Sequence, residues 1–415
     1  MQPVNPVLPQ TGFAADALLA PQQAIVAYFA RVAVTPPTAE IVSLEEAEGR
    51  ILAAPIASDD DYPNAARSAM DGFALLARMA PGSFEIAGEV RMGDAPGAEV
   101  VSGSAVRIAT GGMLPPGTDA VVPVEDARVA GSAMSVDAPV ASGENVVPRA
   151  ADMRRGELLL DAGRRVGAPQ MGLLATIGAT EVAVYRRPLV AVISSGDELV
   201  EPSARLQLGQ IRDSNRYAIA ASLRAMGARP RHYPTVRDEA DAFEAALTIA
   251  LRECDAVVVT GGSSVGERDR LPRAVGNAAS PGVVVHGLRL RPGKPTLLGA
   301  DGGKPILGLP GNPASALMML EAVCAPIVAA LCGTRIAAPT ITARLCEPAH
   351  SRSGWTWYLP VALEDDAGAP LAHPLPLRSF SVSLLARADG YVVMDEREDE
   401  WLAGRLVTVH RFLGG

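Results

Sequence analysis

Four short loops between residues 188 and 326 carry the residue types that bind phosphate groups. Each loop follows an apolar run and is rich in glycine, proline and small polar residues. The four segments, run and loop together, are Leu189–Glu198, Ala256–Asp269, Val283–Pro295 and Ile306–Ser315. Unbroken apolar runs are typical of buried parallel strands, and open parallel sheets bind ligands just beyond the carboxyl ends of their strands. The pattern therefore predicts one crevice, lined by all four loops, that binds a phosphorylated ligand.

The first loop combines exposed backbone amides with an acidic side chain. Gly196 would let the backbone turn sharply after Ser195 and present its amides to an anion. Glu198 then places a carboxylate at the same point. The alternative interpretation is an ordinary strand-to-helix turn with a solvated acid.

The loop after the apolar run Ala256–Thr260 resembles a phosphate cradle. Its candidate ligand-binding residues are Gly261, Gly262, Ser263, Ser264 and Gly266. Neither a GxGxxG nor a GK[ST] spacing is present, which excludes a Rossmann fingerprint and a P-loop. Asp269 closes the loop and could hold a divalent cation through oxygen, or cap a helix. Capping also explains Asp238, although a helix start at the sheet edge is itself an anion site.

The third loop brings cations to a chain that is acidic overall, with a net charge of −9. Arg289, Arg291 and Lys294 lie within six residues, and strand alternation would place the two arginines on one side. The 37 basic residues include only two lysines, Lys294 and Lys304. Because lysine is a compact point charge and arginine a planar fork, they are not interchangeable at a tight phosphate site. A solvated basic strand end is the alternative.

Two further groups of residues stand out. The fourth loop, which contains Pro310, Gly311, Asn312 and Pro313, is held rigid by its prolines and is predicted to shape the pocket. Two upstream segments also resemble short functional motifs: Ser68–Gly72 and Thr110–Gly112. The pair Asp71-Gly72 is also typical of a tight turn.

Composition narrows the function classes. The negative net charge argues against a nucleic-acid surface, which needs clustered positive charge. The first residues lack the pattern of a signal peptide, and the four cysteines lack zinc-ligand spacing. The most apolar stretch, Ala314–Cys332, is interrupted by Glu321 and Pro326 and is interpreted as a buried helix. We therefore expect a cytoplasmic protein without a membrane or nucleic-acid partner.

The order of predicted elements indicates a multidomain α/β plus β protein. Residues 14–32 are predicted to form a helix interrupted at Pro21, and a Ser43–Glu46 capping box predicts a second helix over 43–54. Residues 55–151 are β-rich, with a helix following at 168–177. Residues 187–335 alternate strands with helices at 215–226, 239–252 and 313–331, which predicts a doubly wound parallel sheet. Residues 336–415 return to strands and predict a small β-domain.

In collinear order, nine strings resemble the molybdopterin molybdenumtransferase family, which includes bacterial MoeA and the C-terminal domain of gephyrin. The strings are SAMDGFA (Ser68–Ala74), RIATGGMLPPGTDAVV (Arg107–Val122), GENVVPRAADMRRGE (Gly143–Glu157), SSGDEL (Ser194–Leu199), GQIRDSN (Gly209–Asn215), VRDE (Val236–Glu239), TGGSSVGERD (Thr260–Asp269), RPGKP (Arg291–Pro295) and GLPGNPAS (Gly308–Ser315). Each string alone is weak, but together they span nearly the whole chain.

The resemblance implies four domains and a homodimer. A helical linker domain would comprise residues 14–54 and 152–186, with the β-rich domain of 55–151 inserted in it. The α/β molybdopterin-binding domain of 187–335 and the C-terminal β-domain of 336–415 would follow. The active cleft would be shared between the α/β domain of one subunit and the β-rich domain of the other, which would explain the motif-like texture around Asp71, Thr110 and Asp152.

The resemblance also implies a reaction between adenylylated molybdopterin and molybdate that yields molybdenum cofactor and AMP. Glu198, Asp238 and Asp269 would hold Mg²⁺, and Asp71, Thr110 and Asp152 would complete the catalytic set. The implied ligand-binding residues are Ser195, Gly196, Asp213, Gly261, Gly262, Ser263, Ser264, Gly266, Arg289, Arg291, Lys294, Pro310, Gly311, Asn312 and Pro313. A molybdopterin adenylyltransferase or a recipient molybdoenzyme would be the protein partner.

The chain departs from the family pattern at several positions. Ala66-Arg67 replaces an Asp-Asn-like pair, Gly287 stands where lysine is common, and a C-terminal motif is reduced to Ser353–Tyr358. Ser379-Phe380 likewise replaces a serine-glycine pair. These departures suggest an alternative function, in which a non-catalytic paralogue binds molybdopterin or the finished cofactor and delivers it to a molybdoenzyme.

Overall fold

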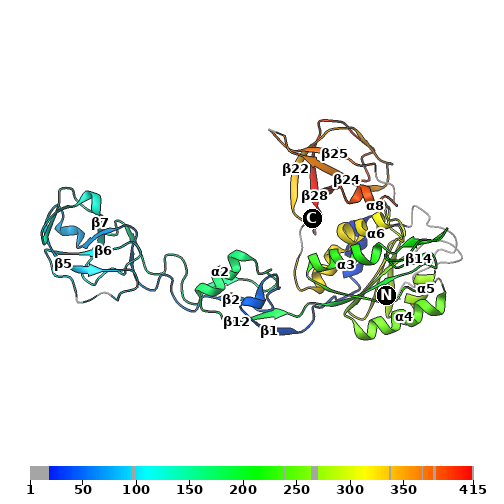
Figure 1. Cartoon of the computed structure of the whole chain (residues 1–415), viewed down its shortest axis with the longest axis horizontal. Helices are drawn as coiled ribbons and strands as arrows, with labels where there is room; N and C mark the ends of the chain where they lie inside the picture. Colours follow the sequence, from blue (N-terminus) through cyan, green and yellow to red (C-terminus); the bar gives the residue numbers. More distant parts are fainter. Residues whose placement is uncertain are drawn as a thin grey trace, which may run out of the picture. The chain divides into compact units, whose positions relative to one another are not determined.

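The computed structural model describes residues 18–95, 97, 99–237, 239–262, 270–335, 338–366, 368–376 and 380–413. The chain forms two compact units (Figure 1). One comprises residues 1–53, 163–167 and 182–415, and the other comprises residues 54–162 and 168–181.

The first unit is built on a six-stranded sheet of order β16-β13-β17-β21-β20-β18. Its strands are β16 (Arg229–His232), β13 (Leu189–Ser194), β17 (Ala256–Thr260), β21 (Lys304–Leu309), β20 (Leu297–Asp301) and β18 (Pro281–His286). The first four are parallel, whereas β20 runs antiparallel to both of its neighbours. The predicted doubly wound parallel sheet therefore contains one antiparallel strand, β20. Because β18 still points the same way as β21, the four predicted loops share one edge of the sheet.

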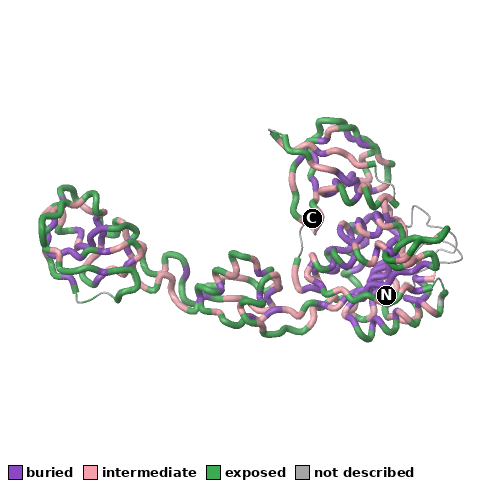
Figure 2. The backbone as a smooth tube through the Cα atoms, in the orientation of Figure 1, coloured by how far each residue is buried: buried purple, intermediate pink, exposed green. Residues whose placement is uncertain are grey.

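Alternate residues of each central strand face opposite layers of helices. On one face, Val190 and Val192 pack in a core with α1 (Pro21–Phe29), α3 (Asn215–Met226) and the helix that follows β21. On the other face, Ala191 and Ile193 pack with α4 (Ala240–Glu253) and α5 (Arg270–Ala278). Both faces of the sheet are thus buried (Figure 2), which explains why β13 and β17 have unbroken apolar sequences.

The predicted helix over 313–331 forms in three parts: α6 (Pro313–Met319), a π-helical turn (Leu320–Cys324) and α7 (Ala325–Leu331). Pro326 lacks an N–H donor and would clash inside a regular helix, so the wider π turn just before it accommodates the ring. Among the described residues, Pro313–Leu331 is long and apolar enough to cross a membrane, but 78% of its most apolar stretch is buried inside the protein. It is a core helix, as predicted.

Two predictions for the N-terminal region need correction. Pro21 begins α1 and does not interrupt a helix, because proline fits the first helical position well. Ala24 and Tyr28 of α1 are fully buried in the core of the α/β sheet. The Ser43–Glu46 capping box forms, with Ser43 Oγ 3.0 Å from Glu46 Oε2, but it leads only into a 3₁₀ turn at Glu45–Ala47.

The C-terminal residues of this unit form a closed β-structure. Its strands are β22 (Thr340–Leu345), β24 (Thr356–Glu364), β25 (Leu371–Pro374), β26 (Gly390–Met394) and β28 (Leu406–Arg411). Pairing runs β24-β25-β22-β28-β26 and returns to β24, which confirms the predicted C-terminal β-domain. The short strand β19 (Leu290–Arg291) adds to β24 in parallel, pairing Leu290 with Thr356. The third loop is therefore hydrogen-bonded directly to this β-domain.

The second unit contains a six-stranded sheet of order β7-β4-β6-β5-β9-β8. Its strands are β7 (Ala120–Pro123), β4 (Gly72–Leu75), β6 (Ser104–Ile108), β5 (Gly82–Val90), β9 (Ala133–Val136) and β8 (Arg128–Ala130). Two short strand pairs, β3 (Arg67–Ser68) with β10 (Val146–Val147) and β2 (Ile56–Ala57) with β11 (Leu158–Leu160), and the helix α2 (Ala168–Thr176) complete it. The sequence pattern at Asp71-Gly72 predicted a turn, whereas Gly72 begins the interior strand β4.

Candidate functional site

Three of the four loops touch one another at the carboxyl edge of the sheet. A Cβ atom on Gly261, whose φ is +92°, would lie 2.6 Å from Ser195 Oγ, so only glycine fits between these loops. A Cβ on Gly311 would lie 3.5 Å from the Cα of Gly261. Asn215, at the start of α3, donates from Nδ2 to the carbonyl of Gly311 at 2.7 Å. Three of the four predicted loops are therefore in direct contact at this edge of the sheet.

Two buried polar atoms at this junction have no partner among the described residues: Ser195 Oγ and Asn215 Oδ1. Ser195 is 8% exposed and Asn215 is also 8% exposed. Buried polar atoms are nearly always satisfied in a complete protein, so such atoms mark places where a ligand or ordered water completes the hydrogen bonding. Asn215 is a candidate site residue that the sequence reasoning did not select, although it lies within a matching string.

Glu198 lies over the first loop. Gly196 has a φ of +146°, and a Cβ there would meet Glu198 Oε2 at 2.6 Å. The carboxylate thus folds back onto the glycine, while the residue as a whole is exposed. Exposure leaves its oxygen atoms accessible to a cation.

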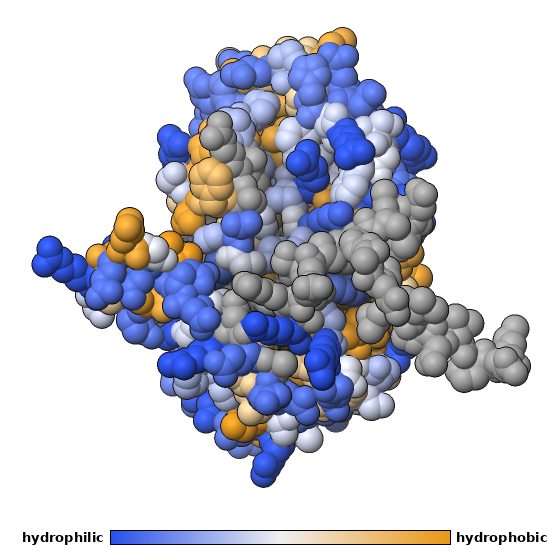
Figure 3. Space-filling model, turned by 90° about the vertical axis from the view of Figure 1, so that its right-hand side faces the viewer, coloured by the Kyte–Doolittle hydropathy of each residue, from blue (hydrophilic) through white to orange (hydrophobic). Residues whose placement is uncertain are grey.

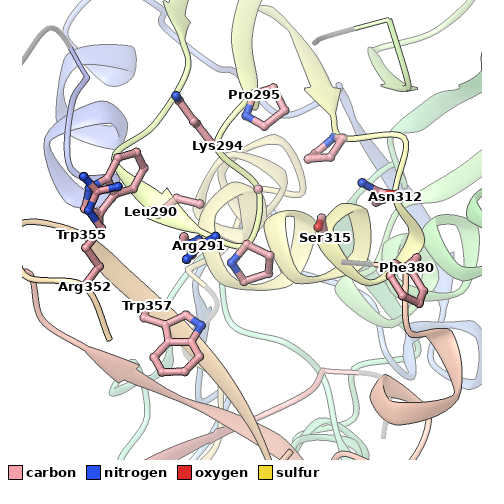
Figure 4. A pocket seen from close by; sticks show the side chains of 13 residues that line it. Leu290, Arg291, Lys294, Pro295, Asn312, Ser315, Arg352, Trp355, Trp357 and Phe380 are labelled. Atoms are coloured by element: carbon pink, nitrogen blue, oxygen red, sulfur yellow. The ribbon is translucent and has the colours of Figure 1, made fainter. Parts of the chain in front are cut away.

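A cavity of about 720 Å³ opens beside these loops (Figure 4). Three cations line it (Arg291, Lys294 and Arg352), together with three aromatic side chains (Trp355, Trp357 and Phe380). The remaining lining residues are Leu290, Pro292, Gly293, Pro295, Pro310, Asn312 and Ser315. None of the described lining residues is acidic. Positive charge beside flat aromatic surfaces suits an anionic ligand that carries a ring system.

Two of the cations contact one indole ring. Lys294 Nζ and Arg352 Cζ each lie 5.7 Å from the ring centroid of Trp355. A cation within about 6 Å of a tryptophan face is attracted by the ring quadrupole. Trp355 therefore holds together two charges that come from different parts of the fold, the third loop and the β-domain.

Replacing Trp355 by leucine is expected to weaken binding of AMP about tenfold, because two cation–π contacts of roughly 0.5–1 kcal/mol each would be lost. Trp355→Phe keeps an aromatic face and is expected to retain most of the affinity. Isothermal titration calorimetry of both variants against the parent protein checks this. Equal affinity in Trp355→Leu would show that other contacts position the two cations.

Two predicted ligand-binding residues have structural partners. Arg289 forms an ion pair with Glu396 at 2.7 Å and does not line the cavity, and the chain from Gly287 to Lys294 is not one continuous strand. The prediction that Arg289 and Arg291 share a face is therefore wrong. Asp213 is buried and accepts hydrogen bonds from the backbone N and side-chain Nε of Arg216, both at 3.1 Å. Asp213 thus caps α3 through its side chain.

In the second unit, the structure brings two predicted residues together. Both the backbone N and the Oγ1 of Thr110 donate to Asp71 Oδ1 at 2.7 Å. The backbone hydrogen bond from Thr110, followed by that from its hydroxyl, lowers the pKa of Asp71 below its usual value. Asp152 lies in a bend, where its N–H donates to the carbonyl of Tyr62 at 2.9 Å. Asp71 is thus held as an exposed, ionised carboxylate.

Asp238, Ser263, Ser264, Gly266 and Asp269 lie outside the described residues. Their predicted roles stay predictions. In the parts of the chain that the structure describes, no group of three or more histidine, cysteine, aspartate or glutamate side chains is suited to a metal ion. Of the three predicted Mg²⁺ ligands, the structure describes Glu198 alone.

The sequence reasoning also missed the β-domain's part in the site. Arg352, Trp355, Trp357 and Phe380 line the cavity, yet the string Ser353–Tyr358 was interpreted as the remnant of a lost motif. The available signal was the pair of tryptophans at alternate positions in a chain that has only three.

Comparison with known proteins covers most of the chain. Family models match three segments: residues 19–178 match the MoeA N-terminal region (domains I and II), residues 191–330 match a probable molybdopterin-binding domain, and residues 342–412 match the MoeA C-terminal region (domain IV). A relative from Nostoc sp. (strain PCC 7120), named molybdopterin molybdenumtransferase, is 37% identical over 71% of this chain and 70% of its own length. A relative of the same name from Bacillus subtilis is 32% identical over 89% of each chain. The chain belongs to the MoeA family.

A solved structure agrees with this membership. The molybdopterin biosynthesis MoeA protein from Pyrococcus horikoshii is 32% identical to this chain, with a TM-score of 0.80 over 95% of this chain and 99% of that one. The match confirms the predicted fold class and the family resemblance. Within the MoeA family, this chain's cavity can now be assigned to two of the matched regions, the molybdopterin-binding domain and domain IV.

Proposed function

We propose that this chain is a molybdopterin molybdenumtransferase, which inserts molybdate into adenylylated molybdopterin and releases AMP. One observation carries the proposal: a cavity with three cations and two tryptophans adjoins loops at which two buried polar atoms have no partner among the described residues. The relatives from Nostoc and Bacillus bear this name. No observation favours the alternative of a non-catalytic carrier.

We assign residues of the cavity roles in binding the substrates or in stabilising the leaving AMP. Lys294 and Arg291 offset the charge of the phosphates and of molybdate, and the backbone amides near Gly261 orient phosphate oxygens. Trp355 and Trp357 provide flat surfaces for the ring system of the pterin. When an oxygen of water or of molybdate bonds to the phosphorus atom that stays on molybdopterin, the bond between the two phosphates breaks and AMP leaves with the bridging oxygen. Charge develops on the departing AMP, and cations already in position stabilise it without reorganising.

We further propose that Glu198, with Asp238 and Asp269, holds Mg²⁺. Carboxylate oxygens are the ligands that Mg²⁺ prefers, and the bound ion would neutralise phosphate charge. Glu198 fits this role because its carboxylate is exposed beside the loop that carries Ser195.

The proposal predicts that Glu198→Ala lowers the rate of AMP release at least about tenfold, which corresponds to roughly 1.4 kcal/mol of transition-state stabilisation. The assay contains adenylylated molybdopterin, molybdate and a series of Mg²⁺ concentrations. The control is Glu201→Ala, which removes an exposed acid that pairs with Arg216. No AMP release by the parent protein at any Mg²⁺ concentration would remove the proposed activity.

A cytoplasmic homodimer whose cleft is completed by Asp71, Thr110 and Asp152 of the other subunit is part of the proposal. It is supported by the fixed, ionised state of Asp71, which otherwise has no evident function in a surface loop. Mixing Asp71→Ala protein with Lys294→Ala protein, each of which is expected to have strongly reduced activity alone, tests it. If the cleft is shared, mixed dimers contain one intact site and part of the activity returns. If each subunit works alone, none returns.

A further inference from the structure

A second polar cavity lies at the opposite, amino-terminal edge of the α/β sheet. Its volume is about 570 Å³, within the range of small-ligand sites. Leu189, the first residue of β13, and Arg229, the first residue of β16, both line it. An adjoining cavity of about 380 Å³ shares these two residues. All of the lining belongs to the first unit.

The charged lining comprises four arginines and two glutamates: Arg50, Arg186, Arg187, Arg229, Glu40 and Glu46. Several of these have partners already. Arg50 pairs with Glu40, and Arg186 pairs at 2.9 Å with Asp255, which lies outside the cavity lining. Glu46 is engaged in the capping box with Ser43.

Two cations remain uncompensated. Arg187 and Arg229 are exposed, and neither forms an ion pair within the described part of the chain. The side chains of the lining carry an excess of two positive charges, which Asp255, the partner of Arg186, reduces to one, in a protein whose net charge is −9. Figure 3 shows one face of the molecule, on which hydrophilic and hydrophobic residues are interspersed. Local positive charge against an acidic background indicates an anion site more strongly than the same charge on a basic protein.

Arg50 provides an independent observation. Its side chain is only 10% exposed, and its Nε is buried without a hydrogen-bond partner among the described residues. One of its terminal nitrogens already donates to the carbonyl of Tyr185 at 2.9 Å. A buried guanidinium donor left unpaired costs stability, and a bound anion is the partner that guanidinium groups prefer.

We propose that this amino-edge cavity is a second anion-binding site, which takes a phosphate dianion, either free or as the terminal group of a nucleotide. Planar guanidinium forks bind phosphate oxygens in pairs. Leu189 is the only apolar residue among the described residues of the lining, so the cavity suits a compact polar ion better than an extended apolar ligand.

The site is separate from the catalytic crevice, which opens at the other end of the same strand. β13 runs from Leu189 in this cavity to Ser194, next to Ser195 in the crevice. Six residues of strand span about 20 Å. Glu40 belongs to β1 (Ala39–Ser43), and Arg186 follows β12 (Glu181–Tyr185), which pairs with β1. A bound anion would therefore tie this strand pair to the edge of the α/β sheet.

The test uses the full-length protein carrying Lys294→Ala, in which phosphate binding at the crevice is weakened. Calorimetric titration with inorganic phosphate, and separately with AMP, is expected to show one saturable site. Adding Arg187→Ser and Arg229→Ser should weaken that binding at least about tenfold, the loss expected when two charged donors to one anion are removed. Because both residues are exposed, the thermal midpoint should not change. Arg397→Ser, an exposed arginine of the β-domain, is the matched control and should leave binding unchanged.

Three outcomes would overturn the proposal: no saturable phosphate site in the Lys294→Ala protein, equal affinity after the two arginine substitutions, or equal loss in the Arg397→Ser control. Stronger binding of AMP than of phosphate would identify a nucleotide as the occupant, and equal binding would identify the phosphate group alone. The second site does not require the proposed transferase activity, so failure of either leaves the other standing.

Discussion

Lys294→Ala is expected to lower kcat/KM for AMP release about a hundredfold, the usual cost of removing one preorganised charged donor from a developing anion. Lys294 lines the cavity beside Arg291 and contacts Trp355. Its compact charge can approach oxygen atoms that a bulkier guanidinium cannot reach, so Lys294→Arg should restore only part of the rate.

The chain offers a matched control for this prediction. Lys304 is the only other lysine. It is the first residue of β21, at the end of the strand away from the crevice, and its Nζ donates to the carbonyl of Leu251. Lys304→Ala should leave turnover unchanged. If both lysine variants have full activity, the cavity is not where the chemistry occurs.

Glu321→Ala is expected to lower the free energy of unfolding of the first unit by about 2–3 kcal/mol. Glu321 is 6% exposed within the π-helical turn. Its two carboxylate oxygens accept hydrogen bonds from the hydroxyl of Ser222 and, at 3.0 Å, from the backbone N of Leu413. Removing the carboxylate leaves both donors without a partner and detaches the end of the C-terminal strand from the helices.

Urea denaturation followed by circular dichroism measures this effect. Glu321→Gln, which keeps one acceptor oxygen and nearly the same volume, should cost less than Glu321→Ala. Glu400→Ala, an exposed position in the β-domain, should have almost no effect. Equal midpoints for Glu321→Ala and the parent protein would show that water or rearranged side chains replace the carboxylate.

Local patterns in the sequence were sufficient to predict the central strands and most helices. β13 and β17 are buried on both faces, so their apolar runs were unambiguous. The strand β16 has the sequence RPRH and owes its place to backbone pairing with β13, which leaves no hydrophobic signal. The capping box at Ser43 was predicted correctly, but the helix after it was predicted too long, because nothing local states how far a helix continues.

The candidate site was predictable only where a loop's own residues define it. Ser195 and Gly261 could be selected because a glycine beside small polar residues, directly after a buried strand, is typical of a backbone that approaches a ligand closely. The contribution of Trp355 and Arg352 depends on the pairing of β19 with β24, a contact between segments about 65 residues apart in sequence. Long-range pairing of this kind has no local sequence signal, so nothing near these two residues indicated that they would reach the crevice.

The same pairing has a practical consequence. Two of the protein's three tryptophans line the cavity, and the third, Trp401, is buried in the β-domain. Intrinsic fluorescence is therefore dominated by indoles whose surroundings change when the cavity fills. Ligand occupancy can therefore be followed in the unlabelled protein through the change in this emission.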